Sequence, residues 1–429
     1  MNNARSVHRA VAHMLAPGSL TAVLAFAHGQ SVANPSTESD YADLTGSSFV
    51  AAPRVPFSAP AVRELVLPQI EDGSSIWGAT GRDSRGHIWV GISAESPGMS
   101  AHLFEYDPVA DTWHDHGSAV DRLKAAGLHR QGEGQIKIHS KIVPGGDGWL
   151  YFASTDEEGE KEDGSALPRW GGHLWRIHPK GRTWEHLLAT PEGLVAVSGV
   201  GRYIYALGYW GHVLYQYDSV SKQVKSVVVG SVNGHVSRNF LADIRGHAFV
   251  PRLSIRSNRL VSATLVEYDQ DLKELASTPL DFYLDKKRSL GMNHGIVGLA
   301  YLPDGRMIFT THAGYLYSIE AGSTGPAVVS AVGWLHPDGE MYIPSLFSLG
   351  GESWLAGVAR RRPVGFEWIV SDLASRTTGA FPIDTGGLQE VLLYGSISRD
   401  NAGRMYVGGW AGKGSNNHRP LMLQIDPGR

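Results

Sequence analysis

Asp243-Ile-Arg-Gly-His-Ala-Phe249 is one copy of a short pattern that runs through the whole chain. In each copy, a turn that contains Gly leads into apolar and aromatic residues, which is typical of a chain that turns and enters a β-strand. The pattern occurs seven times, at a mean interval of roughly 53 residues. The seven copies lie at residues 83–89, 147–151, 201–205, 243–249, 304–308, 350–354 and 400–406.

A second strand-like segment follows each copy, as in His102-Leu-Phe-Glu-Tyr-Asp107. Short strands joined by turns at a period of about 40–60 residues are typical of four-stranded propeller blades. We therefore predict an all-β fold, a seven-bladed β-propeller with four-stranded antiparallel blades. The last repeat lacks a fourth strand, so we expect the N-terminal segment 62–67 to pair with 421–426 and close the ring, which leaves no open sheet edge. The alternative is a two-domain β-sandwich protein.

Composition supports a folded β protein and excludes several function classes. Gly accounts for 52 of 429 residues and aromatic residues for 9 %, which suits short strands joined by tight turns. The formal net charge of −4 argues against nucleic-acid binding through a basic surface. Without Cys, the chain has no disulfide, thiolate nucleophile, iron–sulfur cluster or Cys-ligated zinc.

The N-terminus reads as a targeting segment followed by a linker. Arg5 and Arg9 precede an apolar stretch, and small residues follow it, so residues 1–33 are predicted to be a signal peptide and the protein to be secreted or periplasmic. A cytosolic leader is the alternative. Residues 34–60 are predicted to be a flexible lead-in and 61–429 to form the propeller. No later stretch is apolar enough to span a membrane, so we expect no membrane association, and a monomer.

Functional residues are expected where inner strands and the loops between second and third strands meet at one mouth of the axial channel. The inner strands offer Gln135, Lys137, His139, His235, Arg238, Asn293, His294, Tyr342 and Tyr394. The loops offer Ser154, Thr155, Asp156, Tyr209, Trp210, His212, Arg252, His312, Arg360, Arg361, Arg362 and Trp410.

These side chains suit an anionic substrate with rings. Arg binds carboxylates and sulfates through two parallel hydrogen bonds, and Trp covers the face of a sugar ring. Strand alternation places Lys137 and His139 on the channel side of segment 136–142, whereas His102, His173 and His247 belong to the repeat and are expected to be structural. The acidic run 156–163 is expected to be a solvated loop.

Two segments carry a resemblance to a known family. Residues 132–142 (Gly-Glu-Gly-Gln-Ile-Lys-Ile-His-Ser-Lys-Ile) with 148–152, and residues 237–252, resemble the seven-bladed propeller polysaccharide lyases that act on ulvan, and their relatives that act on rhamnose–glucuronate linkages. The likeness covers roughly residues 70–426. Residues 154–156 depart from the ulvan enzymes, which carry a second His there, and Arg238 lies farther from the Tyr than their Arg does.

The resemblance implies β-elimination on an acidic, uronate-containing polysaccharide. It assigns the roles of catalytic base and acid to His139 and Tyr209, with either residue as the base. Substrate binding is expected of Arg238 and His294, with His235, Arg252, His312, Trp210 and Trp410 around them. No cofactor is required and no metal ligand is assigned, although a structural divalent cation is not excluded by this reading.

Three alternatives remain at this stage. They are an exo-acting, rhamnosidase-like glycoside hydrolase, a non-catalytic glycan-binding propeller, and a metal-dependent lactonase or lyase using His139, His235, His294 and His312.

Overall fold

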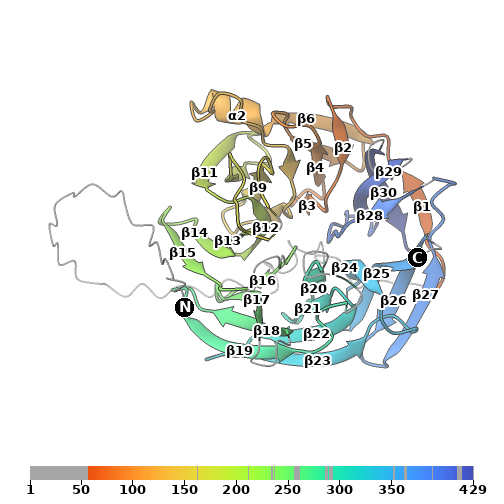
Figure 1. Cartoon of the computed structure of the whole chain (residues 1–429). Coiled ribbons are helices and arrows are strands. Elements are labelled where there is room, and N and C mark those ends of the chain that lie inside the picture. Colours follow the sequence, from red (N-terminus) through yellow and green to blue (C-terminus); the bar gives the residue numbers. More distant parts are fainter. Residues whose placement is uncertain are drawn as a thin grey trace, which may run out of the picture. The chain divides into compact units, whose positions relative to one another are not determined.

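Seven antiparallel sheets arranged around a common axis form a seven-bladed β-propeller in the computed structural model (Figure 1). The model describes residues 57–428 except 162, 211, 233–234, 236, 256–260, 286–287, 289–292, 351–352, 362–364, 389 and 413–417. The predicted signal peptide and most of the predicted lead-in therefore lie outside the described residues. No helix in the described part of the chain is long and apolar enough to cross a membrane.

The first three blades follow one another along the chain. Blade 1 contains β2 (Gly73–Ser75), β3 (Thr80–Arg82), β4 (Ile88–Ala94), β5 (His102–Asp107) and β6 (Thr112–Ser118). The helix α2 (Ala119–Ala125) then leads to blade 2, with β7 (Lys137–Ile138), β8 (Val143–Pro144), β9 (Leu150–Thr155), β10 (Gly172–Ile177) and β11 (Trp184–Thr190). Blade 3 contains β12 (Leu194–Val200), β13 (Tyr203–Gly208), β14 (Val213–Asp218) and β15 (Val224–Val228).

The remaining blades repeat the same order from the axis outward. Blade 4 contains β16 (Leu241–Ala242), β17 (Ala248–Ile255), β18 (Val261–Tyr268) and β19 (Glu274–Leu280). Blade 5 contains β20 (Ile296–Tyr301), β21 (Met307–Thr311), β22 (Tyr315–Glu320) and β23 (Val328–Trp334). Blade 6 contains β24 (Tyr342–Ser348), β25 (Trp354–Arg361), β26 (Gly365–Asp372) and β27 (Thr377–Pro382). Blade 7 contains β28 (Leu392–Leu393), β29 (Met405–Gly412), β30 (His418–Asp426) and β1 (Ala61–Glu64).

The predicted ring closure is confirmed. Strand β1 is the outermost strand of blade 7 and runs antiparallel to β30, with Ala61 opposite Asp426 and Glu64 opposite Leu423. The Leu65 N–H continues the pairing with a 2.9 Å bond to the Met422 carbonyl oxygen. The pairing thus joins the two ends of the propeller across the seam.

The repeated turn joins the first and second strands of a blade and ties them to the third. In blade 4, Asp243 Oδ1 accepts the backbone N–H groups of Arg245 and His247, and Gly246 takes the left-handed conformation, with φ of 79°. The Arg245 and His247 side chains then contact Glu267 of β18. The pattern seen in the sequence is therefore a polar clamp within a blade.

The apolar core lies between neighbouring blades. One cluster joins Tyr205 and Leu207 of blade 3 to Ala248 and Val250 of blade 4. Another joins Trp89 of blade 1 to Phe152 and Trp175 of blade 2. Burial of such large side chains between sheets holds the blades at a set spacing around the axis.

The inner strand of blade 2 differs from the expectation. Segment 136–142 was expected to be one strand, but β7 ends at Ile138 and β8 begins at Val143. Between them, the Ser140 hydroxyl accepts the Ala153 N–H, and the Ile142 N–H turns to Thr80 of blade 1. The interruption carries His139 and Lys141 to the axis.

Ring closure predicts a large effect of a short truncation. A chain that starts at residue 66 lacks β1 and Leu65, whose side chain is 4 % exposed. Loss of the Leu65 side chain alone should remove about 2–5 kcal/mol, against a usual total of about 5–15 kcal/mol. We expect cooperative thermal unfolding, followed by circular dichroism, to be lost or shifted far down. A chain that starts at residue 57 is the control, and equal melting temperatures would contradict the closure.

Candidate active site at the axial channel

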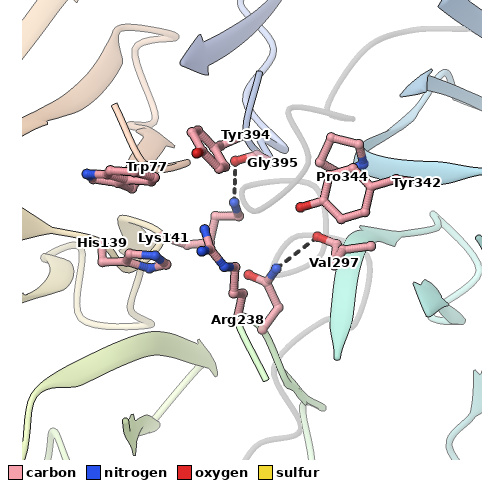
Figure 2. A pocket seen from close by; sticks show the side chains of 10 residues that line it. Trp77, His139, Lys141, Arg238, Val297, Tyr342, Pro344, Tyr394 and Gly395 are labelled. Carbon is pink, nitrogen blue, oxygen red and sulfur yellow. Dashed lines mark hydrogen bonds between the residues drawn. The ribbon is translucent and has the colours of Figure 1, made fainter. Parts of the chain in front are cut away.

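Residues from six of the seven blades line a pocket on the propeller axis (Figure 2). Its enclosed volume is about 10 Å³, which is space for roughly one water-sized group. The lining residues are Trp77, His139, Lys141, Arg238, Asn239, Val297, Tyr342, Pro344, Tyr394 and Gly395. None of them is Asp or Glu, so the pocket is electropositive.

Arg238 is the fixed cation of the pocket. Its backbone N–H donates to the His294 carbonyl oxygen, and the adjacent Asn239 side chain donates to Val297. The guanidinium lies 5.9 Å from the Trp77 ring centroid and 5.4 Å from that of Tyr394. Its Nη1 atom is buried and has no hydrogen-bond partner among the described residues. A buried N–H without a partner is costly, so the pocket is built to receive an acceptor, and an anion fits best.

Lys141 supplies a second nitrogen at the floor of the pocket. Its Nζ donates to the carbonyl oxygens of Gly78 and Gly395, and the latter bond is drawn in Figure 2. Glycine is required at 395, because a Cβ there would collide with the Pro344 carbonyl oxygen. Burial, reinforced by the charge of Arg238, lowers the pKa of Lys141 to about 7. Lys141 therefore changes charge near neutral pH.

His139 is held as a neutral imidazole. Its Nδ1 lies 3.0 Å from the Val195 carbonyl oxygen, and its ring is parallel to Trp77 at 6.3 Å. A carbonyl oxygen only accepts, so Nδ1 carries the proton and Nε2 keeps a lone pair. Burial, then the positive charge of Arg238, holds the pKa of His139 well below its usual range. A neutral imidazole with a free lone pair is a competent proton acceptor.

Tyr342 and Tyr394 also line the pocket, and His294 and His312 pack against Tyr342. The Tyr342 hydroxyl lies 3.0 Å from His294 Nδ1, and His312 Nδ1 accepts the backbone N–H of His294 at 2.9 Å. In Figure 2 the Tyr342 hydroxyl points into the pocket. Burial raises the pKa of Tyr342, and Arg238 opposes that rise. Burial raises the pKa of Tyr394 to about 12, again against Arg238. Both phenols therefore hold their protons at neutral pH.

The pocket thus brings together His139 and Arg238 from the predicted set, with His294 and His312 adjoining through Tyr342. Trp77 and Lys141 were not singled out from the sequence. Lys141 follows the same alternation as Lys137 and His139, and Trp77 lies between β2 and β3 at the inner edge of blade 1. Both positions could therefore have been recognised in the sequence as candidates.

Other predicted residues lie outside the lining. Tyr209 packs against Trp210 at 4.3 Å, in the cluster between blades 3 and 4. His235 is fully buried, parallel to His212, and hydrogen-bonded to the Tyr283 hydroxyl. Catalytic and binding roles for these residues remain predictions.

Arg252 and Trp410 also have partners away from the lining. Arg252 forms an ion pair with Glu274 and contacts the Tyr268 hydroxyl. The Trp410 ring packs on His418 at 5.0 Å. The guanidinium of Arg252 is therefore already neutralised, unlike that of Arg238.

The acidic run is only in part the solvated loop that the sequence suggested, since Asp163 is exposed but other acidic members are not. Asp156 is fully buried, and Glu157 forms an ion pair with Lys137, whose Nζ lies 4.8 Å from the Trp77 ring centroid. Burial raises the pKa of Asp156 to about 6 and that of Glu160 to about 8. Lys137 thus links Glu157 to Trp77, which lines the pocket.

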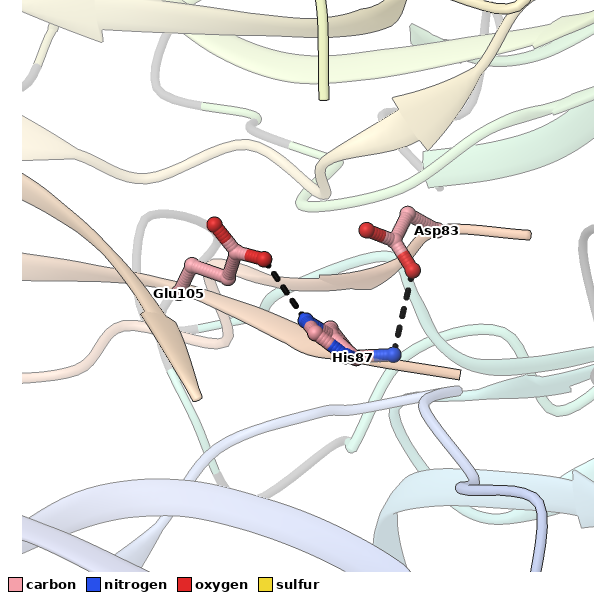
Figure 3. A group of neighbouring side chains, drawn as sticks. All are labelled: Asp83, His87 and Glu105. Atoms are coloured by element: carbon pink, nitrogen blue, oxygen red, sulfur yellow. Dashed lines mark hydrogen bonds and ion pairs between the residues drawn. The ribbon is translucent and has the colours of Figure 1, made fainter. Parts of the chain in front are cut away.

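The arrangement gives the metal-dependent alternative no support. Among the described residues, one group of three His and carboxylate side chains has the spacing of a metal site, Asp83, His87 and Glu105 (Figure 3). Arg85 donates to both carboxylates, and blade 4 repeats the same arrangement with Arg245. The Arg85 guanidinium already neutralises these carboxylates. The group is therefore the network of ion pairs that ties the strands of blade 1 together. None of the four predicted histidines belongs to it.

Comparison with known proteins supports the fold only. No family model and no curated protein matches the chain. The extracellular domain of BT4673 from B. thetaiotaomicron is 14 % identical with a TM-score of 0.50, over 85 % of this chain and 39 % of that one. A Dyadobacter fermentans protein of unknown function is 13 % identical with a TM-score of 0.46, over 85 % and 99 %. The chain therefore spans about two fifths of the BT4673 domain, and such low identity carries no activity across.

Arg238→Lys should weaken binding of D-glucuronate at the pocket. Lysine keeps the charge but loses the two-pronged hydrogen bonding, so we expect a loss of about 1.5–3 kcal/mol in calorimetry. Arg252→Lys is the matched control and should bind as the unchanged protein does. Equal affinities for the two variants would assign Arg238 to structure.

Lys141 should make anion binding depend on pH. D-glucuronate stays ionised above pH 5, whereas Lys141, whose pKa is lowered to about 7, is charged below that pH and neutral above it. Affinity for D-glucuronate should therefore fall as pH rises through about 7, so binding should be weaker at pH 8.5 than at pH 6. Lys141→Met should bind more weakly at pH 6 and lose this dependence. A flat profile for the unchanged protein would contradict the assignment.

Proposed function

We propose that the protein is a polysaccharide lyase that cleaves an acidic, uronate-containing polysaccharide by β-elimination at the axial pocket. One observation carries the proposal: Arg238 presents an unpartnered N–H in a small pocket without carboxylates, beside a neutral His139. The small volume suits the carboxylate of a uronate unit, with the sugar ring above it. Secretion and a rhamnose-containing polymer remain expectations of the sequence.

Arg238 has the first role in the proposed reaction. The C5 proton of a uronate is weakly acidic, and its removal places negative charge on the adjacent carboxylate. A guanidinium that contacts this carboxylate stabilises that charge. Lys141 adds to the effect when it is charged.

Proton transfer is assigned to His139 and Tyr342. His139 Nε2 removes the C5 proton, the electron pair forms the C4–C5 double bond, and the C4–O4 bond breaks. Tyr342 donates its proton to the departing O4, and its hydrogen bond to His294 offers a route for reprotonation. The proton gained by His139 returns to solvent, so the cycle needs no cofactor.

Tyr342 replaces Tyr209 as the proton donor in this proposal, because Tyr342 lines the pocket and Tyr209 does not. His139→Ala and Tyr342→Phe should each lower turnover by ~10²–10⁴ with little change in the affinity for product. Tyr209→Phe should have a much smaller effect. The measurement is absorbance near 235 nm, which reports the unsaturated uronate, on a panel of uronate polysaccharides.

Each outcome of the panel is informative. A large loss for Tyr209→Phe with none for Tyr342→Phe would place the donor in blade 3. Reducing ends without the 235 nm absorbance would indicate the hydrolase, and binding without cleavage would indicate a glycan-binding propeller. Either of the last two results would overturn the lyase proposal.

A further inference from the structure

Blade 2 carries a second, larger cavity away from the channel pocket. Its volume is about 540 Å³, within the range of roughly 300–1,000 Å³ that is usual for small-molecule sites. The lining residues are Leu128, Arg130, Leu167, Pro168, Arg169, Trp170, His173, His186, Ala189, Thr190 and Pro191. We call it the blade 2 groove, and it shares no lining residue with the channel pocket.

A directional chain of hydrogen bonds ends in this groove. Glu133 is 1 % exposed and accepts two bonds from the Arg130 guanidinium. Glu133 Oε1 also lies 3.2 Å from His173 Nε2, and His173 Nδ1 lies 2.9 Å from His186 Nε2. Burial opposes ionisation of Glu133, but Arg130 and His173 outweigh it and hold the pKa of Glu133 below its usual value.

The direction of the chain follows from its ionised end. A carboxylate only accepts, so His173 Nε2 carries a proton. Burial lowers the pKa of His173, so the ring is neutral and its Nδ1 accepts from His186 Nε2–H. His186 is neutral as well, because burial lowers its pKa to about 4. The lone pair of His186 Nδ1 is thus the free end of the chain.

His186 lines the groove, and solvent reaches its Nδ1. The side chain is half-buried, and no hydrogen bond to its Nδ1 is formed within the described residues. The atom is not among the buried polar atoms that lack a partner, so solvent reaches it. The sequence pattern marks His173 as structural, but its link to His186 gives it a positioning role.

The rest of the groove is apolar and electrically balanced. Leu128, Leu167, Pro168, Trp170 and Pro191 supply apolar surface. Trp170 is held by its Nε1 bond to Glu158 and by the Arg130 and Arg169 guanidinium groups at 5.1 and 4.3 Å from its ring. Both arginines are paired with carboxylates, Arg130 with Glu133 and Arg169 with Glu158. In contrast to the channel pocket, the groove holds no uncompensated cation.

We propose that the blade 2 groove is a second binding site, which takes a neutral ring with an apolar face and a hydroxyl group that donates to His186 Nδ1. The apolar wall packs against the ring, and His186 Nδ1 orients the hydroxyl. A deoxy sugar unit and a phenol share this chemistry. The site is independent of the proposed lyase activity.

Nuclear magnetic resonance of protein labelled with ¹⁵N in histidine tests both the proton positions of the two histidines and the binding of a ligand. In the free protein, His173 and His186 should both be neutral with the proton on Nε2 at pH 7. Titration with methyl α-L-rhamnopyranoside or with phenol should shift the His186 Nδ1 signal. The compound that causes the shift shows whether the ligand is a deoxy sugar or a phenol. The opposite proton position on either histidine would overturn the proposal, as would the absence of binding by both probes.

A variant series separates the groove from the channel. His186→Phe keeps an aromatic ring but removes the acceptor, so affinity for the responding probe should fall at least about fivefold. His114→Phe, in the outer strand of blade 1, is the matched control and should bind as the unchanged protein does. Arg238→Lys should also leave probe binding intact, so failure of the lyase proposal would not affect this result. Undiminished binding by His186→Phe would overturn the groove assignment.

Discussion

The antiparallel pairing of β1 with β30 is the constraint on which the rest of the structure depends. Each blade packs its apolar faces against its neighbours, so blade 1 and blade 7 would each expose one face without this seam. Closure also sets the distance of every inner strand from the axis. The pocket gathers side chains from blades 1, 2, 4, 5, 6 and 7. A small opening of the ring would therefore separate Trp77 from Tyr394, which lie on opposite sides of the seam at 4.6 Å.

The charge distribution of the propeller separates its structural and functional cations. In the blade turns, Arg85 and Arg245 lie beside carboxylates from the same blade, and these pairs hold strands together. At the axis, no carboxylate of the described residues pairs with Arg238, and its field acts on the groups around it. The pKa of Lys141 falls to about 7 and that of His139 falls well below its usual range, in both cases through burial first and Arg238 second. Burial and an uncompensated cation thus favour the neutral forms of both neighbours.

The channel pocket and the blade 2 groove differ in the kind of ligand that they suit. The channel pocket is small and electropositive and offers hydrogen-bond donors. The blade 2 groove is larger and apolar, with both arginines paired and one acceptor exposed at His186.

The sequence by itself determined the seven blades and the closing strand, because tight turns and period-two alternation are local features that repeat in register. It also indicated His139, through the alternation of segment 136–142, and Arg238, through its place at the start of an inner strand. Only the tertiary structure decided which candidates meet. Tyr342 and Lys141 reach the pocket through the approach of blades 2, 6 and 7, whereas Tyr209 packs into the core between blades 3 and 4. Only the tertiary structure likewise showed that Arg252 pairs with Glu274 and that Asp156 is buried. The reason is that desolvation and ion-pair partners depend on segments that are distant in the chain.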